Sequence, residues 1–222
     1  MRWILPLIFI SSLAFAENRA VVAIIDTGIN IDSYLIQFLC KIKPIDFTGT
    51  GISDDMGHGT NITATILKDL DPKKVCFVPI KFFSKHSGGD DTWIQALSYS
   101  TRLNPLYVNA SLSGIGSLPN ELNLVQSLLA RNTTYVVAAG NNGLNLDRNC
   151  IVYPACLNIV SPNFRVVGGL RHKIQSVISN YGRVVTDWMD SYSCYNDLCM
   201  EGTSQAAAKL TNKLLKVKYG KK

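Results

Sequence analysis

The sequence predicts an α/β fold with a mainly parallel sheet, and three observations carry this prediction. The run from Ala20 to Ile25 is continuously apolar and rich in β-branched residues, as in strands buried on both faces of a parallel sheet. Similar runs alternate along the chain with segments whose apolar residues recur at helical spacing. Short polar turns that contain glycine follow the apolar runs, at the ends where open α/β folds place ligands.

The expected elements follow this alternation in order. Strands are predicted at 20–25, 75–83, 106–112, 135–139 and 165–168. Helices are predicted from about 58 to 70 and at 91–103, 121–130 and 203–219, each with an apolar side at a spacing of three to four residues. Pro79 lacks a backbone N–H, so its strand is expected at an edge of the sheet or at a bulge.

The first 16 residues are typical of an export signal. Met1-Arg2 supplies the positive end, an apolar stretch follows, and Ala14-Phe15-Ala16 has small residues where a signal peptidase reads them. We therefore expect residues 1–16 to be a signal peptide and 17–222 to form one domain, secreted or periplasmic. No stretch is long and apolar enough for a membrane span, and we expect a monomer.

Six cysteines in an exported chain indicate an oxidising compartment and disulfides. The sequence leaves many connectivities open. Cys150 with Cys156 and Cys194 with Cys199 are natural local pairs, which would leave Cys40 with Cys76. None of the spacings is the C-x-x-C of a zinc site, so no metal site is predicted.

The net charge of +6 is concentrated at the C-terminal end. After Ser204 there is no acidic residue and there are six lysines: Lys209, Lys213, Lys216, Lys218, Lys221 and Lys222. Cations near the end of a helix are a common solvated feature, so the basic charge does not indicate a nucleic-acid partner.

Four polar residues lie at strand ends or helix starts: Asp26, His58, Asn141 and Ser204. Each alone has an ordinary structural interpretation, as a turn residue, a loop histidine or a helix cap. Together they supply a nucleophile, a base, a group that orients the base and an oxyanion donor. That is the complete set for acyl transfer.

The surrounding motifs, in the order Asp-Thr-Gly, Gly-His-Gly-Thr, Ala-Ala-Gly-Asn and Gly-Thr-Ser, resemble those of the subtilisin-like serine proteases, the subtilase family. The resemblance covers nearly all of the chain after the signal. It implies a subtilisin-like three-layer sandwich in which the central sheet is flanked by helices. It also implies a serine endopeptidase acting on protein or peptide substrates. Calcium is common in the family, but no cofactor or calcium site is assigned here.

The resemblance also implies roles for individual residues. Ser204 would be the nucleophile, His58 the base and Asp26 the residue that orients it, with Asn141 as oxyanion donor. The stretch Ser111, Leu112 and Ser113 would pair with the substrate backbone as an added strand. The stretch Ala138, Ala139 and Gly140 would wall the primary specificity pocket.

Some residues depart from the family's pattern, and two alternatives follow. Gln205 stands where Met is usual, Ala208 where Pro is common and Asn61 where His is common. One alternative is therefore a catalytically weak or inactive subtilase-fold binding protein. The other is an aspartic protease, since Asp-Thr-Gly is also its signature. That class needs two facing carboxylates, and the chain has one copy of the motif.

Overall fold

The computed structural model describes residues 17–32 and 34–221. The expected signal peptide, residues 1–16, lies outside the described residues. The central sheet has the strand order β10-β8-β6-β4-β1-β3-β2, with every neighbouring pair parallel and with β9 antiparallel on β8. Its strands are β1 (Ala20–Asp26), β2 (Ile45–Asp46), β3 (Val75–Lys81), β4 (Tyr107–Ala110), β6 (Thr134–Ala138), β8 (Phe164–Arg171), β9 (Ile174–Gln175) and β10 (Asp187–Asp190).

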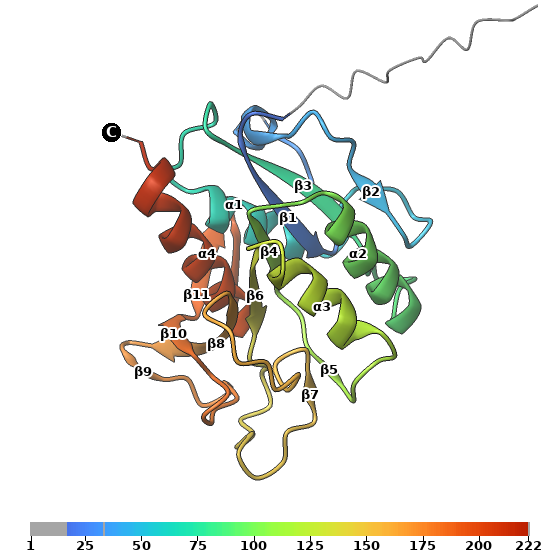
Figure 1. Ribbon diagram of the computed structural model, residues 1–222. Coiled ribbons are helices and arrows are strands. Elements are labelled where there is room, and N and C mark those ends of the chain that lie inside the picture. Colours follow the sequence, from blue (N-terminus) through green and yellow to red (C-terminus); the bar gives the residue numbers. More distant parts are fainter. Residues whose placement is uncertain (1–16, 33, 222) are drawn as a thin grey trace, which may run out of the picture.

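Helices cover both faces of this sheet (Figure 1). They are α1 (His58–Leu67), α2 (Asp90–Arg102), α3 (Glu121–Leu129) and α4 (Thr203–Tyr219), with a short 3-10 helix, η1 (Leu35–Phe38). Successive side chains of β1 alternate between the faces. Val22 and Ile24 pack in a core cluster with residues of α1 and α4, whereas Ala23 and Ile25 pack in a cluster with residues of α2 and α3. The predicted α/β sandwich, with a mainly parallel sheet between helices, is confirmed.

The predicted position of Pro79 at an edge or a bulge is wrong. β3 pairs with β1 along its whole length and with β2 at its end, so it is an interior strand. The carbonyl oxygens of Phe77 and Lys81 accept bonds from Cys40 and Phe47 on the side away from β1. Pro79 lies two residues from each of them and faces the same side, so its missing N–H removes no bond to β1.

Several short strands were not predicted. β10 adds a parallel strand beyond β8, and β5 (Gly114–Ile115) pairs with β7 (Val152–Tyr153). A hairpin of β11 (Tyr192–Tyr195) and β12 (Leu198–Glu201) leads into α4. Asn61 of α1 fixes this hairpin, because its amide donates to the Leu198 carbonyl at 3.0 Å and accepts from the Ser193 hydroxyl at 2.7 Å.

Three disulfides join the cysteines in the pairs named above, Cys40–Cys76, Cys150–Cys156 and Cys194–Cys199. The first ties the segment after η1 to β3, and the third spans the β11–β12 hairpin. In the part of the chain that the structure describes, no helix has both the length and the apolar character needed to cross a bilayer.

Candidate active site

The first turn of α1 carries His58 between two glycines, and both glycines are needed there. Gly57, at the N-cap, has a φ of 76°, which side-chain-bearing residues rarely adopt. A Cβ atom on Gly59 would lie 2.3 Å from the carbonyl oxygen of Gly28. Only glycine therefore lets α1 approach the end of β1 closely enough for His58 to meet Asp26.

Asp26, the last residue of β1, is buried and holds the imidazole. Its Oδ1 lies 2.6 Å from Nδ1 of His58 and accepts the Thr27 N–H at 2.8 Å. Burial by itself lowers the pKa of His58. The charge and hydrogen bond of Asp26, together with the charge of Asp54, outweigh it, so that the pKa is raised. Binding at Nδ1 leaves Nε2 as the nitrogen that can exchange a proton with a substrate or nucleophile.

A second carboxylate, Asp54, organises the same turn, and sequence reasoning missed it. Its Oδ1 accepts hydrogen bonds from the Thr27 hydroxyl (2.8 Å) and the Met56 and Gly57 N–H groups (3.1 and 2.8 Å). Its Oδ2 accepts from the N–H and the hydroxyl of Thr60, at 2.8 and 2.7 Å. A carboxylate at a helix N-terminus satisfies N–H groups that have no partner within the helix. The available signal was an acid four residues before the histidine.

Ser204 lies in the first turn of α4 and is 8% exposed. Its hydroxyl donates to the carbonyl oxygen of Ser111 at 3.0 Å. In return, the Ser111 hydroxyl is placed to donate to the Ser204 carbonyl (3.0 Å) or to Oδ1 of Asn109 (2.8 Å). Asn109 also donates to Thr211 of α4 at 3.0 Å, so the start of α4 is fixed against the end of β4.

Asn141 follows β6 and points its amide at the residue before the serine. Its Oδ1 accepts the N–H and the hydroxyl of Thr203, at 2.8 and 3.0 Å. These contacts fix the amide so that its Nδ2 group is the one left to donate elsewhere. Asn180 holds this loop, because its amide donates to the Ala139 carbonyl and accepts N–H groups of Asn142 and Leu144. Sequence reasoning gave Asn180 no role.

One cleft of about 410 Å³ at the carboxyl ends of the strands brings most of the predicted site residues together. Its lining includes Asp26, His58, Ser111, Leu112, Ser113, Asn141 and Ser204. Ala138, Ala139 and Gly140 are buried in the segment that leads to Asn141 and are not among the lining residues. Their role as walls of a primary pocket stays a prediction.

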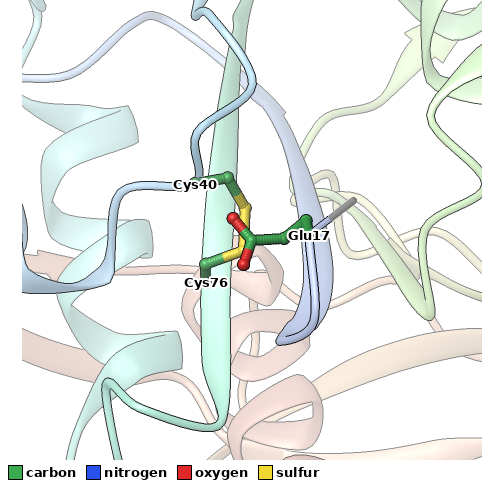
Figure 2. Close-up of side chains that lie close together, drawn as sticks. All are labelled: Glu17, Cys40 and Cys76. Atoms are coloured by element: carbon green, nitrogen blue, oxygen red, sulfur yellow. A yellow bond between two sulfur atoms is a disulfide. The ribbon is translucent and has the colours of Figure 1, made fainter. Parts of the chain in front are cut away.

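One group of potential metal ligands lies elsewhere in the described chain, at Glu17, Cys40 and Cys76 (Figure 2). The two sulfur atoms are joined in a disulfide, so neither is available as a thiolate ligand. Hydrogen bonds from Arg19 lower the pKa of Glu17 to about 2, and its carboxylate also accepts the Lys41 N–H at 3.0 Å. Figure 2 therefore shows a carboxylate beside a disulfide rather than a metal centre.

An α/β sandwich with a carboxylate, an imidazole and a hydroxyl in one cleft, in the chain order Asp, His, Ser, defines a subtilisin-type protein. Residues 17–221 match the sequence profile of the subtilase family, Peptidase S8. The chain belongs to this family of subtilisin-like serine proteases.

Individual relatives agree with this assignment. Subtilisin-like protease 2 of Arthroderma otae is 31% identical over 186 residues, which is 74% of this chain and 40% of that protein. The protein of the same name from Arthroderma benhamiae is 30% identical over the same shares of both chains. The chain thus spans about 40% of the length of the curated relatives it matches.

Solved structures share the fold. A lanthipeptide protease has a TM-score of 0.73 at 19% identity, covering 88% of this chain and 73% of its own. A cold-adapted subtilisin-like serine proteinase has a TM-score of 0.72 at 22% identity, covering 92% of this chain and 78% of its own.

Proposed function

We propose that this chain is a serine endopeptidase that hydrolyses peptide bonds of protein or peptide substrates. Ser204 Oγ attacks the substrate carbonyl, and His58 takes its proton and later delivers it to the leaving amine. Asp26 keeps the proton of the neutral ring on Nδ1 and stabilises the imidazolium that forms. The substrate backbone pairs with Ser111, Leu112 and Ser113 as an added strand.

The observation that carries this proposal is the 2.6 Å contact between Asp26 Oδ1 and His58 Nδ1 in the cleft that Ser204 also lines. A histidine oriented by a buried carboxylate is the base that a serine needs, because a free hydroxyl is almost fully protonated at neutral pH. Folding brings these residues together from three separate segments. A binding surface has no need of that arrangement.

Asn141 is the proposed oxyanion donor. Thr203 holds its Oδ1, so its Nδ2 group and the Ser204 N–H, in the first turn of α4, are the donors for the charge that develops on the substrate oxygen. Removal of the oxyanion asparagine in subtilisin lowers kcat about 10²–10³-fold, and we expect an effect of that order for Asn141→Ala.

A second candidate function, a subtilase-fold binding protein with little activity, has one observation in its favour. The Ser204 hydroxyl donates to the Ser111 carbonyl rather than to the His58 ring. In the endopeptidase proposal a rotation about the Cα–Cβ bond of Ser204 redirects the hydroxyl to Nε2 when substrate is bound. Catalytic hydrogen bonds commonly tighten only in the substrate complex.

An active-site-directed fluorophosphonate probe distinguishes the two functions. Oxidised wild-type protein should be labelled at Ser204 and should cleave a mixed peptide library. Ser204→Ala should lose both signals, with cleavage reduced by about 10³-fold or more. Ser127→Ala, which removes an exposed hydroxyl on α3, is the matched control and should retain them. Absence of both labelling and cleavage in well-folded wild-type protein would favour the binding protein.

We also propose that the protein works outside the reducing cytoplasm, as a monomer. Three disulfides within the described chain fit a secreted or periplasmic location, because thiols stay reduced in the cytosol. The molecular mass of the exported protein, measured by analytical ultracentrifugation, checks that it is a monomer. The mass of its N-terminal peptide checks cleavage after Ala16.

A further inference from the structure

The cleft has an acidic lining although the protein as a whole is basic. Besides Asp26 and His58, the charged residues along it are Asp90 and Glu121, and no lysine or arginine of residues 17–32 or 34–221 lines it. The chain carries a net charge of +6, so this local excess of acid runs against the overall balance. An acidic cleft on a basic protein attracts cationic parts of a ligand.

Glu121 gives this charge a defined position. It is the first residue of α3 and is 1% exposed. Its Oε1 accepts the indole N–H of Trp93 at 2.8 Å, whereas its Oε2 is buried without a hydrogen-bond partner in the described chain. A buried carboxylate oxygen without a donor is unfavourable. A ligand that brings an N–H group to this oxygen removes the penalty.

The side chains around Glu121 in the cleft suit the hydrocarbon part of such a ligand. Trp93 is buried and packs edge-on against Phe82, with ring centroids 5.5 Å apart. Leu112 and Leu118 also line the cleft, and both pack against the core cluster that contains Trp93. Apolar and aromatic walls accommodate the methylene groups of lysine or arginine, and an aromatic face attracts the cationic end. We call the site formed by Phe82, Trp93, Leu112, Leu118 and Glu121 the Glu121 pocket.

We propose that the Glu121 pocket is a substrate subsite that selects a lysine or arginine side chain. The proposal rests on the proposed function, and it names the substrate class of that same cleft. Glu121 anchors the cationic group through Oε2, and Asp90, which is exposed, adds charge at the entrance. Because Oε1 is held by Trp93, only one carboxylate oxygen is free, so the pocket accepts the point charge of lysine as well as the guanidinium of arginine.

The test measures binding, so that it does not depend on catalysis. Ser204→Ala protein is titrated with labelled octapeptides in which each position in turn is Arg, Lys, citrulline or Leu. Citrulline has nearly the shape of arginine but no charge. At one position, Arg and Lys should bind about tenfold or more tightly than citrulline, as expected for a charge-assisted hydrogen bond.

Adding Glu121→Gln to the same protein should abolish the preference at that position. Gln keeps an oxygen for Trp93, so the fold should hold, and thermal melting checks this. Asp91→Asn, which changes an exposed acid that does not line the cleft, is the matched control and should keep the preference.

Two results would overturn the proposal: no position that separates Arg from citrulline in the unaltered pocket, or a preference that survives in folded Glu121→Gln. The first of these needs no variant of Glu121. If fluorophosphonate labelling fails while the Arg preference is present, the endopeptidase proposal falls and the pocket remains. If labelling succeeds and no preference exists, the pocket proposal falls alone.

Discussion

Asp54 and Glu121 are both buried carboxylates near the cleft, and they are held in opposite ways. Asp54 is 5% exposed and accepts five hydrogen bonds, from Thr27, Met56, Gly57 and twice from Thr60. Glu121 is 1% exposed and accepts one, from Trp93. Similar burial therefore does not mean similar hydrogen bonding: both oxygen atoms of Asp54 have donors, whereas Oε2 of Glu121 has none in the described chain.

The difference follows from where each acid lies relative to a helix. Asp54 precedes α1, so the N–H groups of the first turn and the hydroxyls of Thr27 and Thr60 converge on it. Glu121 is itself the first residue of α3, and its side chain points away from its own helix to Trp93 of α2. The Asp54 carboxylate accepts the N–H groups at the start of α1, whereas the Glu121 carboxylate has a donor for only one of its two oxygen atoms.

The largest expected effect comes from removing the charge of Asp54. Asp54→Asn replaces one carboxylate oxygen with an NH₂ group, which cannot accept a hydrogen bond. Some of the five N–H and hydroxyl groups that donate to Asp54 therefore lose their acceptor. We expect the free energy of unfolding to fall by about 2–4 kcal/mol, because hydrogen bonds to a buried charge are strong. Urea denaturation of the oxidised protein measures this change. A stability equal to that of Asp91→Asn, an exposed acid whose change should matter by no more than about 1 kcal/mol, would contradict the structural role.

Glu121→Gln should change stability much less, within about 1 kcal/mol at neutral pH, and the size of the change should depend on pH. Burial raises the pKa of Glu121; the hydrogen bond from Trp93 partly offsets this, and the charge of Asp90 adds to it. A carboxyl whose folded pKa is raised contributes stability below the unfolded value of about 4.3, and that contribution is lost as the pH rises through the folded pKa.

The variant cannot titrate at this position, so the unfolding free energy of Glu121→Gln minus that of wild type should increase with pH over that interval and then level off. Urea unfolding at a series of pH values measures the difference. A flat difference, or one that decreases with pH, would show that Oε2 is not the unsatisfied group described here.

The strands and helices differ in how far the local sequence predicts them. β1 was predictable because a run buried on both faces is continuously apolar, and α4 because its alanines follow a Gly-Thr turn. β10 was not predictable, because its four residues, Asp187–Asp190, include two acids and because it forms a strand only by pairing with β8. The interior position of β3 was not predicted either. Whether the missing N–H of Pro79 disrupts the sheet depends on the side that Pro79 faces, and the pairing register of the strand sets that side.

At the site, motif residues were predictable and their supports were not. The glycines around His58 mark a tight approach of α1 to β1, and this is visible in the local sequence. Asn180 acts on groups that the fold brings from the segment after β6, and the pattern around it gives no sign of them. Asp54 accepts four of its five hydrogen bonds from residues within six positions, and only Thr27 comes from another segment. Glu121 was predictable only as the start of a helix. Its unpaired oxygen becomes apparent once α2 has brought Trp93 beside it.

The smallest expected effect is a shift in the pH–rate profile, and it tests whether the charge of Asp54 reaches the base. The pKa of His58 is raised above its ordinary value of about 6.5, because the charges of Asp26 and Asp54 outweigh burial. In the proposed mechanism neutral His58 is the active form, so kcat/KM should increase with pH through a midpoint above that value. Asp54→Asn removes one of these charges and should move the midpoint to lower pH.

Asp91→Asn should leave this midpoint in place. The measurement is peptide cleavage across pH at a temperature where each variant is fully folded. An unchanged midpoint in Asp54→Asn would mean that the acid only stabilises the turn of α1, and the contrast with Glu121 would then be one of hydrogen bonding alone. A lower midpoint, with the stability loss above, would show that one saturated carboxylate both holds the helix start and sets the basicity of the residue that begins it.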